Sequence, residues 1–213
     1  MCYNKSMTKE KANQIYGILL GDNPSPKSEL NFKSHLHCLI AVMLSAQCTD
    51  ARVNIATKGL FAKFKTAQDF ASASEQEIAQ EIKSVNYYPT KAKRIKEMCT
   101  ILQEKFNGQV PGTIEELTTL PGVGRKTAQV VLVESFGVPA VPVDTHIFRV
   151  CNRLGVCRAK NVEETESAIR EYFDEKSFIN LHKLLVLHGR YVCRAKNPDC
   201  ENCKLKDICE KRI

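Results

Sequence analysis

The fold is decided by the stretch Leu120-Pro121-Gly122-Val123-Gly124-Arg125-Lys126-Thr127-Ala128. A glycine-rich turn here leads directly into an apolar helical pattern. Glycine lets the backbone approach another group closely, and the free N–H groups of a helix N-terminus favour a bound anion. Taken alone, the segment allows two interpretations. It is either a turn that grips a phosphate beside a reactive lysine, or a surface helix-turn-helix whose lysine is solvated.

Composition limits the size of the protein and the chemistry of its partners. The chain has 213 residues, enough for one domain or two small ones. Its net charge is +7, from 31 basic and 24 acidic residues. A basic surface favours phosphate-rich partners, although charge alone does not distinguish DNA from RNA or from an acidic membrane.

No segment of the sequence predicts a membrane span or an export signal. The longest apolar runs, Val130-Val131-Leu132-Val133 and Leu184-Leu185-Val186-Leu187, are far shorter than the roughly 20 residues that cross a bilayer. Residues 1–14 are polar and lack the apolar core of a signal peptide. We therefore expect a soluble, cytoplasmic protein with no membrane partner.

Helical periodicity recurs along almost the whole chain, and we find no strand alternation. The pattern predicts helices over residues 8–20, 90–106 and 178–188, a helix that ends near Ser45, and a helix over residues 129–136. Capping patterns that suit many short helices occur at Ser74-x-x-Glu77, Thr113-x-x-Glu116 and Asn161-x-x-Glu164. The expected fold class is therefore all-α.

The glycine turn can bind a nucleic-acid backbone. Pro121 ends the preceding helix, and Gly122 and Gly124 can both adopt positive φ. The N–H groups of these glycines and of the next residues would then converge on one phosphate oxygen, a contact that grips DNA without reading its sequence. Such a turn looks like the helix-hairpin-helix motif of DNA repair proteins.

Lys126 distinguishes a binding hairpin from a catalytic one. A helix N-terminus and the neighbouring Arg125 both disfavour a charged ammonium. A neutral lysine amine is the nucleophile that forms Schiff bases. The alternative is that Lys126 only contacts a phosphate; both roles bind DNA, but only the first forms a covalent adduct.

Asp144 is the candidate carboxylate. It follows the extended segment Val141-Pro142-Val143 and stands where a helix N-cap belongs. A helix N-terminus keeps a carboxylate ionised, so Asp144 could stabilise an oxocarbenium-like sugar or accept a proton from the attacking amine. The simpler alternative is that it caps the helix and does nothing else.

The chain has ten cysteines, and four of them crowd its C-terminus. Cys38 and Cys99 lie in apolar helical patterns and are expected in the core. The spacing Cys193-x6-Cys200-x2-Cys203-x5-Cys209 suits one metal centre in a reducing compartment better than two disulfides. Sulfur ligation of this kind fits either zinc or an iron–sulfur cluster. With Arg194, Lys196 and Lys204, the loop could be a second clamp on the DNA backbone.

Together these elements resemble the endonuclease III family of DNA glycosylases, over nearly the whole chain. The motifs that carry the resemblance are Glu29-Leu30-Asn31-Phe32, Leu44-Ser45-Ala46-Gln47, Leu120–Ala128, Val143–Val150, Leu187-His188-Gly189-Arg190 and the cysteine loop, Cys193 to Cys209. The resemblance implies that Lys126 and Asp144 are catalytic, and that Cys193, Cys200, Cys203 and Cys209 hold a 4Fe–4S cluster. It also implies that Gln47 fills the gap left by a flipped base.

The function implied by this family is base excision repair. Its members remove oxidised pyrimidines from duplex DNA through a lysine Schiff base, and then cut the strand 3′ to the abasic site by β-elimination. The implied partner is duplex DNA with damaged pyrimidines or abasic sites. We expect a monomer that works at the nucleoid of a bacterium or archaeon.

The resemblance also implies two lobes. One is a six-helix domain of residues 28–137 that contains the hairpin. The other joins residues 1–27 to residues 138–213 and carries Asp144 and the cluster. Lys126 and Asp144 are expected to face each other across the cleft between the lobes.

One stretch departs from the family pattern. Where the family usually has a glycine, a bulky apolar residue and often a tyrosine, this chain has Asn86-Tyr87-Tyr88-Pro89. Asparagine tolerates positive φ better than most residues, so the turn could survive the loss of glycine. Tyr87 would then take the place of the apolar wedge in the opposite strand.

Two other functions are considered. A monofunctional adenine or mismatch glycosylase would share the aspartate and the cysteine loop but would lack the hairpin lysine. A non-catalytic DNA-binding or redox-sensing module would keep the hairpin and the cluster and would need neither the Lys126 amine nor the Asp144 charge.

Overall fold

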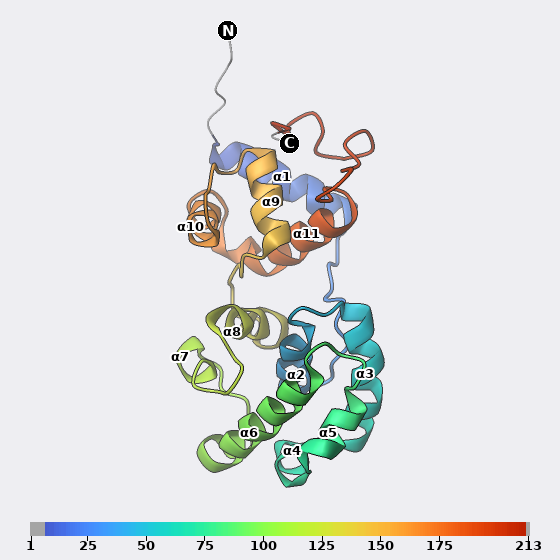
Figure 1. Ribbon diagram of the computed structural model, residues 1–213. Coiled ribbons are helices and arrows are strands. Elements are labelled where there is room, and N and C mark those ends of the chain that lie inside the picture. Colours follow the sequence, from blue (N-terminus) through green and yellow to red (C-terminus); the bar gives the residue numbers. More distant parts are fainter. Residues whose placement is uncertain (1–6, 212–213) are drawn as a thin grey trace. The chain divides into compact units, whose positions relative to one another are not determined.

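The structure is a computed structural model, and it describes residues 7–211 of the chain (Figure 1). This part of the chain contains helices and no strand, as the periodicity predicts. The chain divides into two compact units: one is Ser28–Val138, and the other joins the segment up to Lys27 to the segment from Pro139 onward. No helix among the described residues is long and apolar enough to cross a membrane. Residues 1–6 of the polar N-terminal segment lie outside the described residues.

The core of the Ser28–Val138 unit includes the buried sides of α2 and α6. The buried side of α2 includes Leu39 and Leu44, and that of α6 includes Ile95 and Leu102, all fully buried in one apolar cluster. The helices of this unit are α2 (His35–Ser45), α3 (Asp50–Lys63), α4 (Ala67–Ser72), α5 (Glu75–Glu81), α6 (Tyr88–Phe106), α7 (Ile114–Leu117) and α8 (Arg125–Val131).

Local capping explains where the short helices of this unit begin. Ser74 and Glu77 form the predicted capping box at the start of α5. Thr66 and Asp69 form a second one at α4, which the sequence analysis did not single out. The Thr113 hydroxyl accepts from the Glu116 N–H at α7. Each cap satisfies backbone N–H groups that have no partner within the helix.

The helix after the hairpin differs from the prediction. Residues 129–136 do not continue as one α-helix: α8 ends at Val131, and Leu132–Phe136 forms a π-helical turn. Gly137 stops it with a φ of 68°. Within this turn the Ser135 hydroxyl oxygen forms a hydrogen bond with Nδ1 of His35 at 2.5 Å, and the Phe136 ring stacks on the His35 ring. These contacts tie the turn to the start of α2.

The second unit gathers α1 (Lys9–Asp22), α9 (Thr145–Leu154), α10 (Val162–Tyr172), the 3-10 turn Glu175–Ser177 and α11 (Phe178–Tyr191). Its core includes Ile15 from α1, Ile147 from α9 and Leu185 from α11, each fully buried. Gly189 lets α11 lie close to α9, because a Cβ there would be 2.8 Å from the Cβ of His146. An alanine at this point would force the two helices apart.

Most predicted helix positions are confirmed, with small shifts at the ends. The helix predicted over 8–20 is α1, which begins after its N-cap Thr8. The helix predicted to end near Ser45 ends there. Those predicted over 90–106 and 178–188 are α6 and α11. Cys38 and Cys99 are fully buried, as expected.

Candidate DNA interface and cysteine loop

The hairpin turn between α7 and α8 depends on one glycine with a positive φ. Gly122 has a φ of 81°. A Cβ at this position would lie 2.9 Å from Cε of Met43 and 3.0 Å from Cδ of Arg94. Gly122 therefore satisfies both a backbone and a space requirement, and it packs the hairpin onto α2 and α6.

Gly124 behaves differently, and one expectation is wrong here. Its φ is −88°, in the extended region, so it does not use the positive φ that glycine allows. A Cβ at Gly124 would meet nothing within 4 Å. The fold itself does not require glycine at this exposed N-cap of α8. The missing side chain leaves room for another molecule to approach the backbone, which is the second reason to place glycine in a turn.

Arg125 and Lys126 form the first turn of α8, and both side chains are exposed. The first N–H groups of a helix have no partner within it and carry the positive end of its dipole. Val123 donates its N–H to the Leu120 carbonyl at 3.1 Å, so that N–H is already used inside the turn. The Lys126 amine therefore stands beside a surface suited to an anion.

Gln47 lies in the turn that follows α2. Its side chain is exposed and its φ is 55°, a left-handed conformation that is uncommon for glutamine. Lys91, a buried lysine of α6, donates to the carbonyls of Leu44 at 2.8 Å and Ala46 at 2.7 Å. Burial lowers the pKa of Lys91 below its ordinary value. This side chain satisfies the C-terminal carbonyls of α2 and fixes the turn that presents Gln47.

Tyr87 precedes α6 and is also left-handed, with φ 58° and ψ 30°. Its ring is 65% exposed, which is unusual for so large an aromatic side chain. The expectation that Asn86 would carry the positive φ is wrong, because the strained residue is Tyr87. Asn86 instead donates its side-chain amide to the Gln47 carbonyl at 2.7 Å. The two predicted DNA-contacting turns are therefore joined directly.

In the other unit, Asp144 is the N-cap of α9, as predicted. Its Oδ1 accepts the N–H of Ile147 at 2.8 Å. The side chain is half-buried, after a buried extended segment, Val141 to Val143. One carboxylate oxygen of Asp144 is therefore used to satisfy a free N–H at the start of α9.

The four C-terminal cysteines share one neighbourhood, and none of them forms a disulfide. Burial raises the pKa of Cys203 and Cys209, and the other thiols of the loop raise it further. A metal centre binds cysteines as thiolates, and its positive charge offsets the repulsion between neighbouring thiolates. Among the described residues, no three His, Cys, Asp or Glu side chains form a site for a single metal ion.

Two arginines of α9 hold the first part of the cysteine loop, and the sequence analysis missed both. Arg149 donates to the carbonyls of Cys193 at 3.0 Å and Gly189 at 2.7 Å. Arg153 donates to the Arg194 carbonyl at 2.7 Å, and its Nη1 lies 3.6 Å from the Cys193 sulfur. Their spacing of one helical turn was the available signal, but their partners lie about 40 residues further along the chain.

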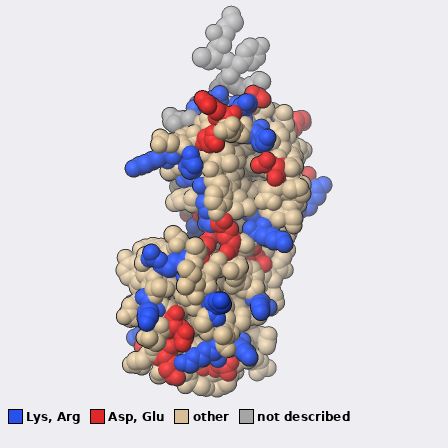
Figure 2. Space-filling view, turned by 90° about the vertical axis from the view of Figure 1, so that its right-hand side faces the viewer, with Lys and Arg blue, Asp and Glu red and all other residues tan. Residues whose placement is uncertain are grey.

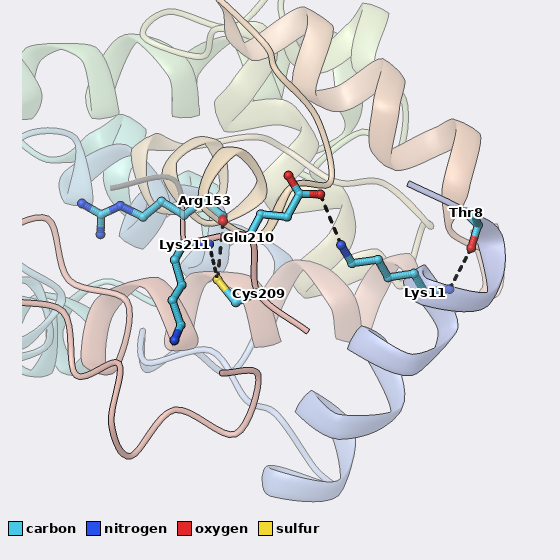
Figure 3. Close-up of polar contacts among 6 residues, drawn as sticks. All are labelled: Thr8, Lys11, Arg153, Cys209, Glu210 and Lys211. Atoms are coloured by element: carbon cyan, nitrogen blue, oxygen red, sulfur yellow. Dashed lines mark hydrogen bonds and ion pairs between the residues drawn. The ribbon is translucent and has the colours of Figure 1, made fainter. Parts of the chain in front are cut away.

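The end of the loop is fastened in the same unit (Figure 3). The Cys209 thiol donates to the Arg153 carbonyl at 3.4 Å, and the Lys211 N–H donates to the Cys209 sulfur at 3.3 Å. Glu210 forms an ion pair with Lys11 of α1 at 3.3 Å. Gly155, at the end of α9, has a φ of 82°, and a Cβ there would overlap the Glu210 carboxylate, which would have to move.

Basic side chains are distributed rather than gathered on the face shown in Figure 2, where acidic side chains lie among them. Of the predicted loop contacts, Lys196 is exposed. Arg194 is exposed too, but its guanidinium donates to the Asn197 carbonyl at 3.0 Å. Arg194 thus braces the loop as well as charging its surface.

Known proteins resemble this chain along almost its full length. Residues 40–175 match the HhH-GPD superfamily of base excision DNA repair proteins. Endonuclease III of Rickettsia felis is 44% identical over 96% of this chain and 96% of its own length. Endonuclease III of Escherichia coli is also 44% identical, over 96% of this chain and 97% of its own. A solved structure of a trapped endonuclease III–DNA covalent intermediate superimposes with a TM-score of 0.90 at 40% identity, covering 96% of this chain and 97% of that one.

Proposed function

The chain belongs to the endonuclease III family of HhH-GPD base excision DNA repair proteins, and we propose that Lys126 and Asp144 carry its chemistry on oxidised pyrimidines. It is an enzyme of base excision repair, a DNA glycosylase and abasic-site lyase. One observation carries the residue assignment: Lys126 occupies the first turn after the glycine hairpin, at a helix N-terminus open to an anion.

In the proposed reaction the hairpin grips the DNA backbone and Lys126 attacks the sugar. The neutral Nζ forms a bond to C1′ while the C1′–N bond to the damaged base breaks, and the base leaves with that electron pair and takes up a proton. The new C1′–N ammonium loses a proton to Asp144, the C1′–O4′ bond then breaks while O4′ takes up that proton, and the opened sugar is left as a protonated Schiff base. Loss of a C2′ proton expels the 3′ phosphate, which breaks the strand 3′ to the lesion. Because the hairpin holds phosphate through backbone N–H groups, it acts on any sequence.

Asp144 supplies the negative charge in this proposal. Its ionised carboxylate stabilises positive charge on the sugar as the base departs, and it accepts the proton that the attacking amine loses. Lys126 lies in the Ser28–Val138 unit and Asp144 in the other unit of the chain. The carboxylate keeps its structural duty at the same time, because one oxygen remains on the Ile147 N–H.

Gln47 and Tyr87 are proposed to contact the duplex where the damaged base has left it. Both are exposed and held in strained turns of the same unit. An amide can hydrogen-bond to the base that has lost its pairing partner, and an aromatic ring can stack on unpaired bases of the opposite strand. Gly122, Gly124, Arg125, Arg194 and Lys196 complete the proposed DNA contacts.

The cysteine loop is proposed to hold a 4Fe–4S cluster, with Cys193, Cys200, Cys203 and Cys209 as its ligands. The donor set fits, because four reduced thiols lie in one short loop braced by Arg149 and Arg153. Four thiolates are the usual ligands of such a cluster. When bound, it would cross-link the loop and supply no step of the reaction above. The enzyme is further proposed to act as a monomer at bacterial or archaeal DNA in the cytoplasm.

Borohydride trapping tests the assignment of Lys126. Purified protein is incubated with an abasic-site duplex and sodium borohydride, which reduces a Schiff base to a stable amine link. Wild type should give a covalent adduct, and Lys126→Gln should give none. Arg125→Gln is the matched control: it should bind the duplex less tightly and still form the adduct. A non-catalytic binding module, or a glycosylase that uses no lysine, would give no adduct with wild type.

A further inference from the structure

Two of the described residues with positive φ are side-chain types that rarely adopt it and are also proposed to contact DNA. The positive-φ residues other than glycine are Gln47, Tyr87, Asn107, Asn197 and Lys211. Asparagine tolerates this region, whereas glutamine and tyrosine do so at a cost in free energy. Strain of this kind persists only where surrounding contacts impose it, and it is concentrated at functional sites.

The contacts that impose it come from one short segment. Asn86 and Lys91 donate to three carbonyls at the end of α2: Lys91 to those of Leu44 and Ala46, and Asn86 to that of Gln47 itself, at 2.7 Å. The Lys91 bonds fix the end of the helix. The Asn86 bond fixes the strained residue, because it holds the Gln47 carbonyl in the direction that the left-handed conformation requires.

Asn86 is also held from its other side. Its Oδ1 accepts from Nη1 of Arg52, on α3, at 3.4 Å. The amide is therefore oriented with its N–H₂ toward Gln47 and its oxygen toward α3. Since Asn86 directly precedes Tyr87, one side chain links the backbone of the first turn to the backbone that carries the second.

We propose that Asn86 is a positioning residue, which couples the Gln47 and Tyr87 turns so that both side chains reach a duplex gap together. This inference rests on the proposed function of the two residues. Preorganised turns lose less conformational freedom on binding. The coupling therefore raises affinity for a duplex in which one base is flipped out or missing.

The affected property is recognition of the gap and of the base opposite it. Once Gln47 and Tyr87 are fixed relative to each other, an opposite base must fit the space that they leave. Without the Asn86 bond only the Lys91 contacts link the two turns, so the Gln47 turn moves more freely relative to Tyr87 and adapts to different bases. We therefore expect Asn86 to increase the difference in affinity between opposite bases.

The experiment compares Asn86→Ala and Asn86→Gly with wild type, using duplexes that contain an uncleavable tetrahydrofuran abasic analogue opposite each of the four bases. Affinity for the analogue should fall about fivefold, the typical effect of one lost hydrogen bond. Affinity for undamaged duplex should be unchanged. The spread of affinity over the four opposite bases should narrow. With 2-aminopurine opposite the analogue, the fluorescence change on binding should be smaller in both variants.

Asn54→Ala is the matched control. Asn54 lies in the same unit and makes two bonds of the same kind, to the Glu29 carbonyl at 2.7 Å and from the Asn31 N–H at 2.8 Å. It should lower thermal stability without changing the ratio of analogue to undamaged affinity. The inference is overturned if the ratio and the opposite-base spread are unchanged in both Asn86 variants, or if Asn54→Ala changes them equally. If wild type gives no borohydride adduct and no preference for the analogue, the proposed function fails instead, and this inference fails with it.

Discussion

The Asp144 carboxylate accepts the backbone N–H of Ile147 at 2.8 Å, so the residue proposed to stabilise positive charge on the sugar also caps α9. The two roles differ in what they demand of the side chain. A cap needs an oxygen of the right reach, and asparagine supplies one as well as aspartate does. Stabilising positive charge needs the negative charge itself.

Asp144→Asn should separate these roles. We expect a change in unfolding free energy below about 1 kcal/mol, because only the interaction of the charge with the helix dipole is lost. Turnover on a duplex with an oxidised pyrimidine should fall on the order of 10²–10³-fold. Asp144→Ala should lose similar activity and about a further 1 kcal/mol of stability, because the cap is gone. Single-turnover cleavage and urea unfolding measure the two effects, and wild-type turnover in Asp144→Asn would leave capping as the sole role.

Alanine should affect different properties at the two hairpin glycines: stability at Gly122 and DNA affinity at Gly124. Gly122→Ala forces a left-handed alanine whose Cβ lies 2.9 Å from Met43. We expect it to destabilise the fold by about 1–3 kcal/mol. Thermal unfolding followed by circular dichroism measures this loss.

Gly124→Ala should leave the stability within about 0.5 kcal/mol, since a poorer N-cap and a less flexible unfolded chain oppose each other. Its affinity for the abasic-analogue duplex should nevertheless fall about tenfold or more, because a methyl group keeps the phosphate away from the backbone N–H groups. Fluorescence anisotropy at fixed salt measures the affinity. A Gly124→Ala protein that binds as tightly as wild type would mean that no phosphate approaches this turn.

The pH dependence of stability should include a contribution from His37. This ring is buried and stacks on Phe61, with the ring centroids 4.0 Å apart. Burial lowers the pKa of His37 below its usual 6.5, and the charge of Lys33 lowers it further. The unfolded chain therefore binds the proton more readily. The stability that the neutral ring contributes is fully present above pH 6.5 and is lost progressively as the pH falls below that value.

His37→Phe keeps the stacking and removes the titration. Its unfolding free energy should decline less between pH 7 and pH 5 than that of wild type. Denaturant unfolding at several pH values gives the two slopes. Equal slopes would show that the buried ring does not control this part of the pH profile.

Arg153 should control how firmly the cysteine loop retains the proposed iron–sulfur cluster. Its fork donates to the carbonyls of Arg194 and Ala195 and approaches the Cys193 sulfur. Arg153→Lys keeps the charge but loses the fork, so we expect several-fold faster release of iron to a chelator. Iron content and the decay of visible absorbance follow the release.

Arg170→Lys is the control for this substitution. Arg170 lies in the same unit, on α10, and its guanidinium pairs with Glu166 at 2.9 Å. It should retain iron as wild type does. Equal rates of release in the two variants would contradict a specific role for Arg153.

Features set by neighbouring residues could be predicted from the sequence. The Asp144 cap, the Ser74 capping box and the burial of Cys38 each depend on a few adjacent positions, and the structure has all three. Features that depend on distant partners could not. Nothing near Gly124 in the sequence shows that its φ is extended, and nothing near Arg149 or Arg153 shows that they meet carbonyls of the cysteine loop.

The turn at Asn86 shows the same limit. Its departure from the family pattern was visible in the sequence, and positive φ was expected there because asparagine tolerates it. In the structure Tyr87 has the positive φ, and the Asn86 side chain instead donates to the Gln47 carbonyl, 39 positions away. A partner so distant in the sequence has no signature in the local pattern. The joint use of Lys126 and Asp144 remains a prediction, which the kinetics of their variants test.

The chain assembles one of its units from both of its ends, and this has a consequence for synthesis. Helix α1 is made before the Ser28–Val138 unit, but the helix α11 and the Glu210 carboxylate that it contacts are made after that unit. At about 5–20 residues per second, the Ser28–Val138 unit is complete on the order of ten seconds before those partners emerge. During that interval the apolar side of α1, including Ile15, lacks its contacts with α11. A ribosome that stalls before α11 would therefore release a polypeptide whose Ser28–Val138 unit is folded and whose helix α1 exposes apolar side chains. Such a polypeptide is a target for chaperones and proteases.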